Sequence, residues 1–218
     1  MNFTQLSEAI QAYAETTEQL FVDNIPNFIQ LAEERIYNAV QIPAIRKNVI
    51  GTFTDGDCYL ALPNDYLASF SLAVIDSSGN YKYLLDKDVN FIRESYPSAS
   101  TQDEPQYYAI FGPQSNDLDE LTFILGPTPD ANYSVELHYF YYPESIVTAG
   151  TSWLGDNFDT ALLYGALVEA YTYMKGEADV IAQYDKQYQN ALGLLKMLGD
   201  GKDRRDAYRN GQVRDQVV

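Results

Sequence analysis

The chain has 218 residues, of which 46% are hydrophobic and 21% charged, a composition typical of a soluble globular protein with one large domain or two small ones. No run approaches the ~20 apolar residues of a membrane-spanning helix, and the start lacks the order of a signal peptide, so we expect a cytosolic product without a membrane partner. A net charge of −17 argues against binding nucleic acid through its phosphates, and the single cysteine, Cys58, excludes an internal disulfide or a thiolate metal cluster.

Two helices are predicted in the first forty residues. Thr4 can cap a segment whose apolar residues Leu6, Ile10, Tyr13 and Ala14 recur at helical spacing. Asn24 and Pro26 supply the start signal of a second helix that stops before Pro43. Its apolar stripe comprises Phe28, Ile29, Ala32, Ile36, Ala39 and Val40, and we expect Glu33, Glu34 and Arg35 to point away from it.

From about residue 49 to residue 142 the apolar period changes to two, which predicts short strands of an antiparallel sheet. The predicted strands are residues 49–54, 58–62, 69–75, 81–85, 107–111, 121–125 and 133–142. Ser77 to Asn80 and Thr54 to Asp57 have the composition of tight hairpin turns. In the last strand Val135, Leu137, Tyr139 and Tyr141 share one face, and a sandwich or curled sheet is the expected architecture.

Helical spacing returns after Pro143. Ser152 or Asp156 can cap one helix, Gly176 sits where it should stop, and a second helix starts near Glu177. Because the amino-terminal and carboxy-terminal pairs each carry an apolar stripe, we expect a four-helix bundle with the sheet as an inserted lobe, an α+β fold. The expected divisions are 1–48 and 146–200 for the bundle, 49–145 for the β lobe and 201–218 for an extended arm.

The last segment reverses the charge of the rest. Residues 1–200 hold nine Lys/Arg against 28 Asp/Glu, net −19, whereas residues 201–218 hold five against three, net +2. Gly201 and Gly211 are potential breakers, and the segment has too few apolar residues to offset its conformational entropy. We expect this arm to become ordered against a partner.

Catalytic signals are weak. His138, the only histidine, lies in a tyrosine-rich strand without an identifiable triad, and Cys58 opens a strand without a second ligand or base. Asp55 with Asp57 lacks the other ligands of a calcium loop. Asp117, Asp119 and Glu120 form another acidic group, but 31 acidic residues produce close pairs by chance. With no glycine-rich phosphate loop either, we expect no enzyme activity, cofactor or metal.

Nineteen tyrosines are the one compositional excess. Tyrosine suits subunit interfaces and sugar stacking, because it combines a large ring with a hydroxyl group. Filling of a sheet core by Tyr107, Tyr108, Tyr139 and Tyr141 is an equally good interpretation.

Three stretches carry a resemblance to a known family: NIPNFIQLAEERIYNAVQIPAIR, YLALPNDYLASFSLAVID and YYPESIVTAGTSWLGDNFDTALLYGALVEAYTYMKGE. Together, over most of residues 24–198, they resemble the head-to-tail adaptors of short-tailed phages, the tail tubular protein A type. The order of a tyrosine-rich strand, a proline, a Trp-Leu link and two helices around an acidic turn is its most specific part.

The resemblance implies a structural virion protein of the tail or neck. Such adaptors form a dodecameric ring between the portal protein and the tail nozzle, with a channel for double-stranded DNA and sometimes tail fibres attached. In that family the carboxy-terminal arm grips the portal, so we expect portal contacts from Arg204, Arg205, Tyr208, Arg209 and Arg214. An acidic lumen would repel passing phosphates. We also expect a mostly monomeric free subunit that assembles when its arm docks.

Two alternatives remain open. One is a carbohydrate-binding or glycan-cleaving β-sandwich module associated with the tail, which requires exposed aromatic residues beside carboxylates. The other is a related neck component of long-tailed phages, which would share the interface role but have different neighbours.

Overall fold

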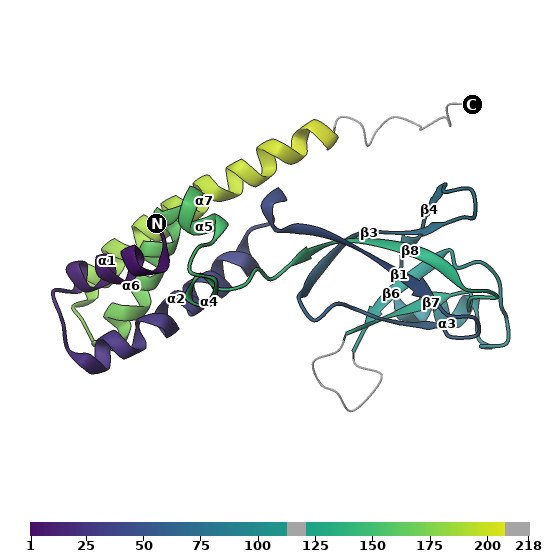
Figure 1. Ribbon diagram of the computed structural model, residues 1–218, viewed down its shortest axis with the longest axis horizontal. Coiled ribbons are helices and arrows are strands. Elements are labelled where there is room, and N and C mark those ends of the chain that lie inside the picture. Colours follow the sequence, from purple (N-terminus) through teal and green to yellow (C-terminus); the bar gives the residue numbers. More distant parts are fainter. Residues whose placement is uncertain (113–120, 208–218) are drawn as a thin grey trace. The chain divides into compact units, whose positions relative to one another are not determined.

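The computed structural model describes residues 1–112 and 121–207. Within these residues the protein is mixed α+β, with seven α-helices and two four-stranded sheets (Figure 1). The chain divides into two compact units. The helical unit combines Met1–Ile45 with the chain from Pro143 onward, and the β unit is Arg46–Tyr142.

The helical unit begins with α1 (Phe3–Ala14) and α2 (Gln19–Ala39). Asn2, rather than Thr4, caps α1: its side chain accepts a hydrogen bond from the Gln5 backbone N–H, and the Gln5 side chain accepts one from the Asn2 N–H. The expected start of the second helix near Asn24 is also wrong, because α2 begins at Gln19 and continues through Pro26. Phe21 and Ile25 extend the buried stripe toward the amino terminus, and we infer that their burial outweighs the backbone hydrogen bond lost at the proline.

The second half of the helical unit contains α4 (Ile146–Ala149), α5 (Trp153–Asn157), α6 (Asp159–Tyr173) and α7 (Ala178–Ala207). Ser152 caps the short helix α5, since its hydroxyl accepts a hydrogen bond from the Gly155 N–H at 3.1 Å. Helix α6 packs against α1, α2 and α7. It is buried on most sides through a set of small and aliphatic residues: Ala161, Leu162, Leu163, Gly165, Ala166, Leu167 and Ala170.

The expectation that Gly201 breaks the last helix is wrong. Gly201 does not end the helix, which continues through it to Ala207. The first seven residues of the segment expected to be an extended arm therefore have helical backbone. Residues 208–218 lie outside the described part of the chain.

The strands of the β unit form two sheets with the orders β1-β8-β3-β4 and β2-β7-β6-β5. Their bounds are β1 Arg46–Phe53, β2 Tyr59–Ala61, β3 Tyr66–Ile75, β4 Tyr81–Tyr83, β5 Leu85–Asp86, β6 Tyr107–Phe111, β7 Thr122–Gly126 and β8 Tyr133–Tyr141. Pairing is antiparallel except between β5 and β6, so the antiparallel expectation is wrong for that one pair. A shared core contains residues of both sheets, including Leu72, Phe123 and Leu137.

Two expected strand connections are wrong because the chain crosses between sheets. The turn at Thr54 to Asp57 exists, with the Asp57 N–H bonded to the Thr54 carbonyl, but it does not close a hairpin because β1 pairs with β8 and β2 pairs with β7. The single strand expected at residues 81–85 is two strands, one in each sheet. The crossing residue, Leu84, is buried and donates its N–H to Leu72 in the first sheet.

The hairpin expected at Ser77 to Asn80 is confirmed. It joins β3 to β4, and the Asp76 carboxylate accepts hydrogen bonds from the N–H groups of Ser78 and Asn80. Gly79 in this turn has φ of 82°, a conformation that suits glycine. Between β5 and β6 the chain forms the short helix α3 (Val89–Ser95), which is capped by Asp88.

Candidate functional site and assembly surfaces

His138 lies on β8, on the solvent-facing side of the first sheet. Its Nε2 is 3.8 Å from the Glu136 carboxylate, and that carboxylate accepts a hydrogen bond of 2.7 Å from the Asn48 side chain. The Tyr81 hydroxyl hydrogen-bonds to Glu136 as well, which raises the pKa of Tyr81. Asn48 and Tyr81 thus hydrogen-bond to a largely buried carboxylate, and His138 lies beside it without a hydrogen bond.

The other reactive candidates have structural partners. Cys58 is buried beside β2, where its backbone carbonyl accepts a hydrogen bond from the Leu125 N–H. The Asp57 carboxylate accepts one from the Tyr59 N–H, and the Asp55 N–H donates to the Asn132 side chain. Asp117, Asp119 and Glu120 fall outside the described residues.

Two of the five residues expected to bind the portal belong to the described part of the chain. Arg204 and Arg205 belong to the last turns of α7, so their backbone is helical. Tyr208, Arg209 and Arg214 lie outside the described residues. A basic helix end therefore leads directly into the rest of the basic segment.

Four tyrosines expected to fill a sheet core do pack into the β unit. Tyr108 and Tyr139 are buried, and Tyr141 packs against the same core. Tyr107 packs instead on the cluster formed by Ile92, Ala109 and Ile124. The core interpretation is confirmed for Tyr108, Tyr139 and Tyr141 and is wrong for Tyr107.

The solvent-facing side of the first sheet is unusually apolar. We call it the open face and define it by Ile50 of β1, Phe70 and Ala73 of β3, and Tyr81 and Tyr83 of β4, with the Glu136 cluster between them. The register places Ile50 opposite Glu136, Glu136 opposite Ala73 and Ala73 opposite Tyr83, which makes one continuous row. Ile50, Phe70, Tyr81 and Tyr83 are all exposed, with Ile50 at 65%.

On the second sheet, apolar residues outside the shared core are covered by a helix. Helix α3 packs on it, and Ile92 contacts Ala109 of β6 and Ile124 of β7 in a buried cluster. An antiparallel sheet with one solvated face usually carries polar residues there. The open face departs from that pattern, and an exposed apolar surface of this kind is typical of interaction sites.

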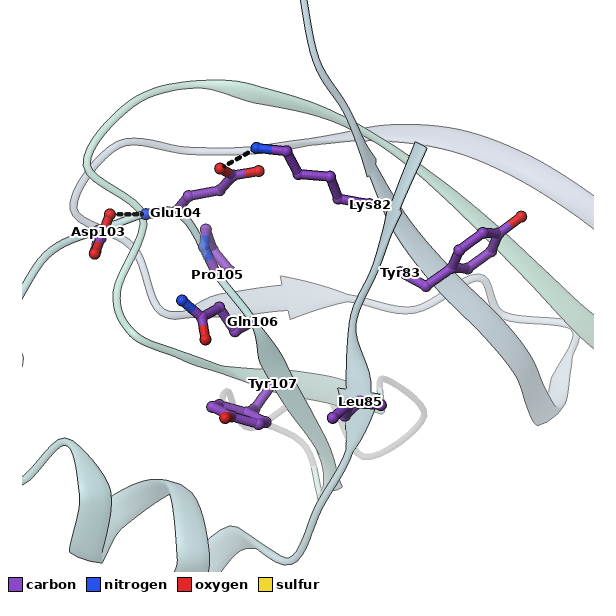
Figure 2. Close-up of a pocket in the computed structure, with 8 residues that line it drawn as sticks. All are labelled: Lys82, Tyr83, Leu85, Asp103, Glu104, Pro105, Gln106 and Tyr107. Atoms are coloured by element: carbon purple, nitrogen blue, oxygen red, sulfur yellow. Dashed lines mark hydrogen bonds and ion pairs between the residues drawn. The ribbon is translucent and has the colours of Figure 1, made fainter. Parts of the chain in front are cut away.

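A hollow of about 410 Å³ lies beside the open face, between β4 and the start of β6 (Figure 2). Lys82 and Glu104 form an ion pair of 2.6 Å across one end of it. Leu85 and Tyr107 supply apolar parts of the lining, whereas the ring of Tyr83 points away from the ion pair (Figure 2). A second hollow of about 450 Å³ shares Lys82 and Glu104, so the ion pair separates the two. The lining combines the half-buried Tyr107 with the carboxylates of Asp103 and Glu104.

Aromatic rings also gather in the helical unit. Tyr184 of α7 lies against Tyr171 and Tyr164 of α6 and Tyr13 of α1, with ring centroids 5.0, 6.2 and 6.4 Å away. Burial, together with a hydrogen bond to Tyr171, raises the pKa of Tyr184 to about 12. The Tyr171 hydroxyl donates to the Tyr13 carbonyl at 2.9 Å. These contacts connect α1, α6 and α7.

Sequence reasoning missed two acidic residues. Glu33 of α2 was expected to face away from the apolar stripe, but it is buried and accepts a hydrogen bond from the Ile146 N–H. Glu136 lies on the face of β8 opposite the core residues Val135 and Leu137, and the alternation of the strand gave no reason to expect its burial. The open face itself had a signal, because the β3 run Leu72 to Ile75 is apolar at every position, as strands covered on both faces are.

Within residues 1–112 and 121–207, no helix has the length and hydropathy needed to cross a membrane.

Comparison with known proteins shows the family of the chain. A search of curated proteins found no match. The model of the family described as SU10 adaptor protein matches residues 1–215, and thus includes the helices, the β unit and nearly all of the basic segment. The chain therefore belongs to the SU10 adaptor protein family, a family of phage structural proteins.

Proposed function

We propose that the protein is a head-to-tail adaptor that forms a ring between the portal and the tail nozzle and leaves a channel for DNA. The family match over residues 1–215 carries this proposal, because it spans both compact units and the basic segment that the proposed attachment requires. Membership of an adaptor family is consistent with a virion component that has no catalytic role.

We place the protein closest to the short-tailed phage adaptors of the tail tubular protein A type, with twelve copies in the ring. In this proposal α1, α2, α6 and α7 act as a four-helix bundle, and the two sheets act as a sandwich lobe. The exposed apolar residues of the open face support a further contact, with the nozzle or a tail fibre.

Attachment to the portal is assigned to the end of the chain. Arg204, Arg205, Arg209 and Arg214 are proposed to pair with portal carboxylates, and Tyr208 to act as an aromatic anchor. The continuation of α7 to Ala207 supports a helix that carries this basic segment away from the last buried turn.

The charge distribution supports passage of DNA without adhesion. The β unit, residues 46–142, holds five Lys/Arg against 14 Asp/Glu, net −9, and residues 1–200 together carry net −19. A ring of such subunits concentrates negative charge around its channel wherever these carboxylates face inward, and a lumen of that kind repels phosphates. The same repulsion between copies favours a monomeric free subunit that assembles on the portal.

The test compares three forms of the protein mixed with the portal of the same virus. These are the full chain, a chain ending at Ala207 and the double variant Arg209→Gln/Arg214→Gln. Electron microscopy and sedimentation should show rings on the portal with the full chain and few or none with the two altered forms. Lys87→Gln/Lys175→Gln is the matched control, since it removes the same charge from exposed sites elsewhere and should leave ring formation intact.

Full attachment by the chain that ends at Ala207 would contradict the role of the arm. Stable rings of the full chain without portal would contradict assembly on docking. A full chain that never bound the portal would contradict the proposed function as a whole.

The hollow in Figure 2 supports a second candidate, a carbohydrate-binding module on the tail. Its lining places Tyr107 in the same hollow as Asp103 and Glu104, which is the combination of ring and carboxylate that sugar binding requires. Removal of residues 208–218 should leave glycan binding unchanged, whereas Tyr107→Ala should reduce it. A glycan array that shows no binding to the full chain would eliminate this candidate.

A further inference from the structure

The first sheet of the β unit has one long edge strand. β1 has eight residues, and β8 is the strand that pairs with it in the described chain, whereas the edge strands β2, β4 and β5 have three, three and two residues. Alternate residues of an edge strand direct their backbone N–H and C=O groups away from the sheet, where another strand can pair with them. Among the described strands, β1 is therefore the longest template for strand addition.

Most of β1 lacks the features by which edge strands usually avoid such pairing, namely prolines, bulges and projecting charged side chains. Its register with β8 is continuous over all eight residues, and residues 48–53 contain neither a proline nor a charged residue. The two charged residues at its start contact their own sheet. Lys47 forms an ion pair of 2.8 Å with Asp65, and the Arg46 guanidinium lies over the Phe70 ring.

The opposite edge of the same sheet has the matching strand direction. The strand order is β1-β8-β3-β4 and all three pairings are antiparallel, so β4 runs opposite to β1 (Figure 1). When a second copy is placed with its β1 beside β4 and its strands in the same directions, the two edges meet in antiparallel orientation. This contact joins unlike surfaces, so it is head-to-tail and closes into a ring when its rotation divides a full turn.

The side chains at the two edges match on the open face. Ile50 of β1 is 65% exposed and Tyr83 of β4 is 59% exposed, and they lie at the two ends of one row across the four strands. When the sheet is extended by a second copy, the Ile50 of that copy follows Tyr83 in the row. Tyr81, on the same face of β4 and 49% exposed, is then the diagonal neighbour. An aromatic residue beside a β-branched one is a favourable cross-strand pair.

The charges at the two edges are complementary. In the antiparallel arrangement the start of β1 lies beside the end of β4. Arg46 and Lys47 begin β1, whereas residues 85–88, which follow β4, hold two carboxylates against one lysine, net −1. Lys82, the charged residue within β4, is on the core face of the sheet and forms an ion pair with Glu104, so it is not on the face of Ile50.

We infer that β4 of one subunit pairs with β1 of the next, so that the first sheets of neighbouring subunits form one continuous sheet around the ring. This inference rests on the proposed function, because it names a contact between ring neighbours. The contact has two parts. Main-chain hydrogen bonds join β1 to the three residues of β4, and Ile50 packs against Tyr81 and Tyr83 on the open face. Pairing of β1 with a second β1 would instead be symmetric and would stop at a dimer.

The direct test is disulfide trapping in rings that the full chain assembles on the portal. Ile50→Cys and Tyr83→Cys are introduced together, because directly opposed residues of antiparallel strands have Cα atoms about 4.5–5.5 Å apart, within reach of a disulfide. Oxidation should give a covalent ladder of dimers, trimers and larger species, since each subunit then links to two neighbours. The buried Cys58 is retained throughout.

The matched control for the trapping is Ile50→Cys/Lys82→Cys. Its second cysteine is one residue from Tyr83 but on the other face of the sheet, so it should give no ladder. Each single cysteine variant should also remain monomeric after oxidation.

A lysine on β1 provides a second, independent test, because natural edge strands use lysine to prevent pairing. Ile50→Lys should lower the yield of rings about tenfold, whereas Ile50→Thr, which keeps a β-branched side chain, should assemble nearly as well as the unsubstituted chain. Leu20→Lys is the matched control, since Leu20 is also 65% exposed but lies on α2. Thermal unfolding of the free subunits should show equal stability for all of these variants, because both positions are exposed.

The outcomes separate the two proposals. Rings on the portal without a ladder from Ile50→Cys/Tyr83→Cys, or with a full yield from Ile50→Lys, would overturn the β1–β4 contact and leave the adaptor function standing. Failure of the unsubstituted full chain to assemble on the portal would contradict the adaptor function itself. A disulfide-linked dimer from Ile50→Cys alone would show a symmetric β1–β1 contact and would also overturn the inference.

Discussion

Glu33 of α2 accepts a hydrogen bond of 3.0 Å from the backbone N–H of Ile146, 113 positions along the chain. Ile146 is the first residue of α4, so the carboxylate binds at a helix start that the Ser145 side chain also caps. The contact joins the two segments of the helical unit on either side of the β unit. Burial raises the pKa of Glu33, and its hydrogen bonds with Ser145 and Ile146 offset only part of this rise.

Truncation of this side chain should destabilise the helical unit. Glu33→Ala leaves the buried Ile146 N–H without its partner, and we expect the free energy of unfolding to fall by about 1–3 kcal/mol. Glu33→Gln keeps an acceptor oxygen and should cost less. Urea unfolding at pH 7 measures both, and equal losses for the two variants would contradict the importance of the hydrogen bond.

The raised pKa of Glu33 also predicts a pH dependence. Between the unfolded value near 4.5 and the higher folded value, the folded protein holds a proton that the unfolded chain has lost. The contribution of Glu33 is therefore fully present below pH 4.5 and is lost as pH rises through the folded pKa. In Glu33→Gln this decline should be absent. The free energy of unfolding of the unsubstituted chain and of Glu33→Gln is measured from pH 4 to pH 8. If the two curves run parallel, the pKa of Glu33 is not raised in the folded protein.

Two glycines of α7 should respond oppositely to alanine. A Cβ at Gly193 would meet nothing within 4 Å, whereas a Cβ at Gly199 would lie 2.6 Å from the backbone carbonyl oxygen of Gln41. We expect Gly193→Ala to stabilise the protein by up to about 1 kcal/mol through helix propensity. Gly199→Ala should destabilise it by about 1–3 kcal/mol, because the backbone must move. Thermal unfolding of the pair checks the prediction, and stabilisation by Gly199→Ala would contradict the close approach.

The sequence predicted where helices and strands occur better than how they connect. Most predicted strands lie within a few residues of an observed one, because alternation reports directly on a half-buried strand. The sheet that each strand joins was not predictable in the same way. The turn after Thr54 has hairpin chemistry, but the same local turn serves a chain that crosses to another sheet, and only the long-range pairing with β8 and β7 decides between them.

The features that the sequence did not predict have different explanations. Glu33 lies four residues after Ile29 and three before Ile36, so helical spacing alone places it within the buried stripe, and only its charge suggested otherwise. For the open face, the run Leu72 to Ile75 signals a strand that is apolar on both faces, but no local pattern says that α3 packs on the other sheet and leaves this one uncovered. The basic segment was visible from charge alone, but the continuation of α7 through Gly201 was not, because glycine lowers helix propensity without forbidding a helix.

The tyrosine cluster around Tyr184 should make the helical unit sensitive to alkali. The pKa of Tyr184 in the folded protein is about 12, against about 10 in an unfolded chain, so the stabilisation that it contributes is complete below pH 10 and is lost as pH rises toward 12. Tyr184→Phe removes the ionisable hydroxyl and should reduce the loss of stability between pH 9 and pH 12, measured by urea unfolding at each pH. Tyr133→Phe is the matched control in the β unit, where a hydrogen bond to Asp130 raises the pKa of Tyr133 to about 12 as well. If Tyr184→Phe loses as much stability over this range as the unsubstituted chain, ionisation within the cluster does not govern the alkaline transition.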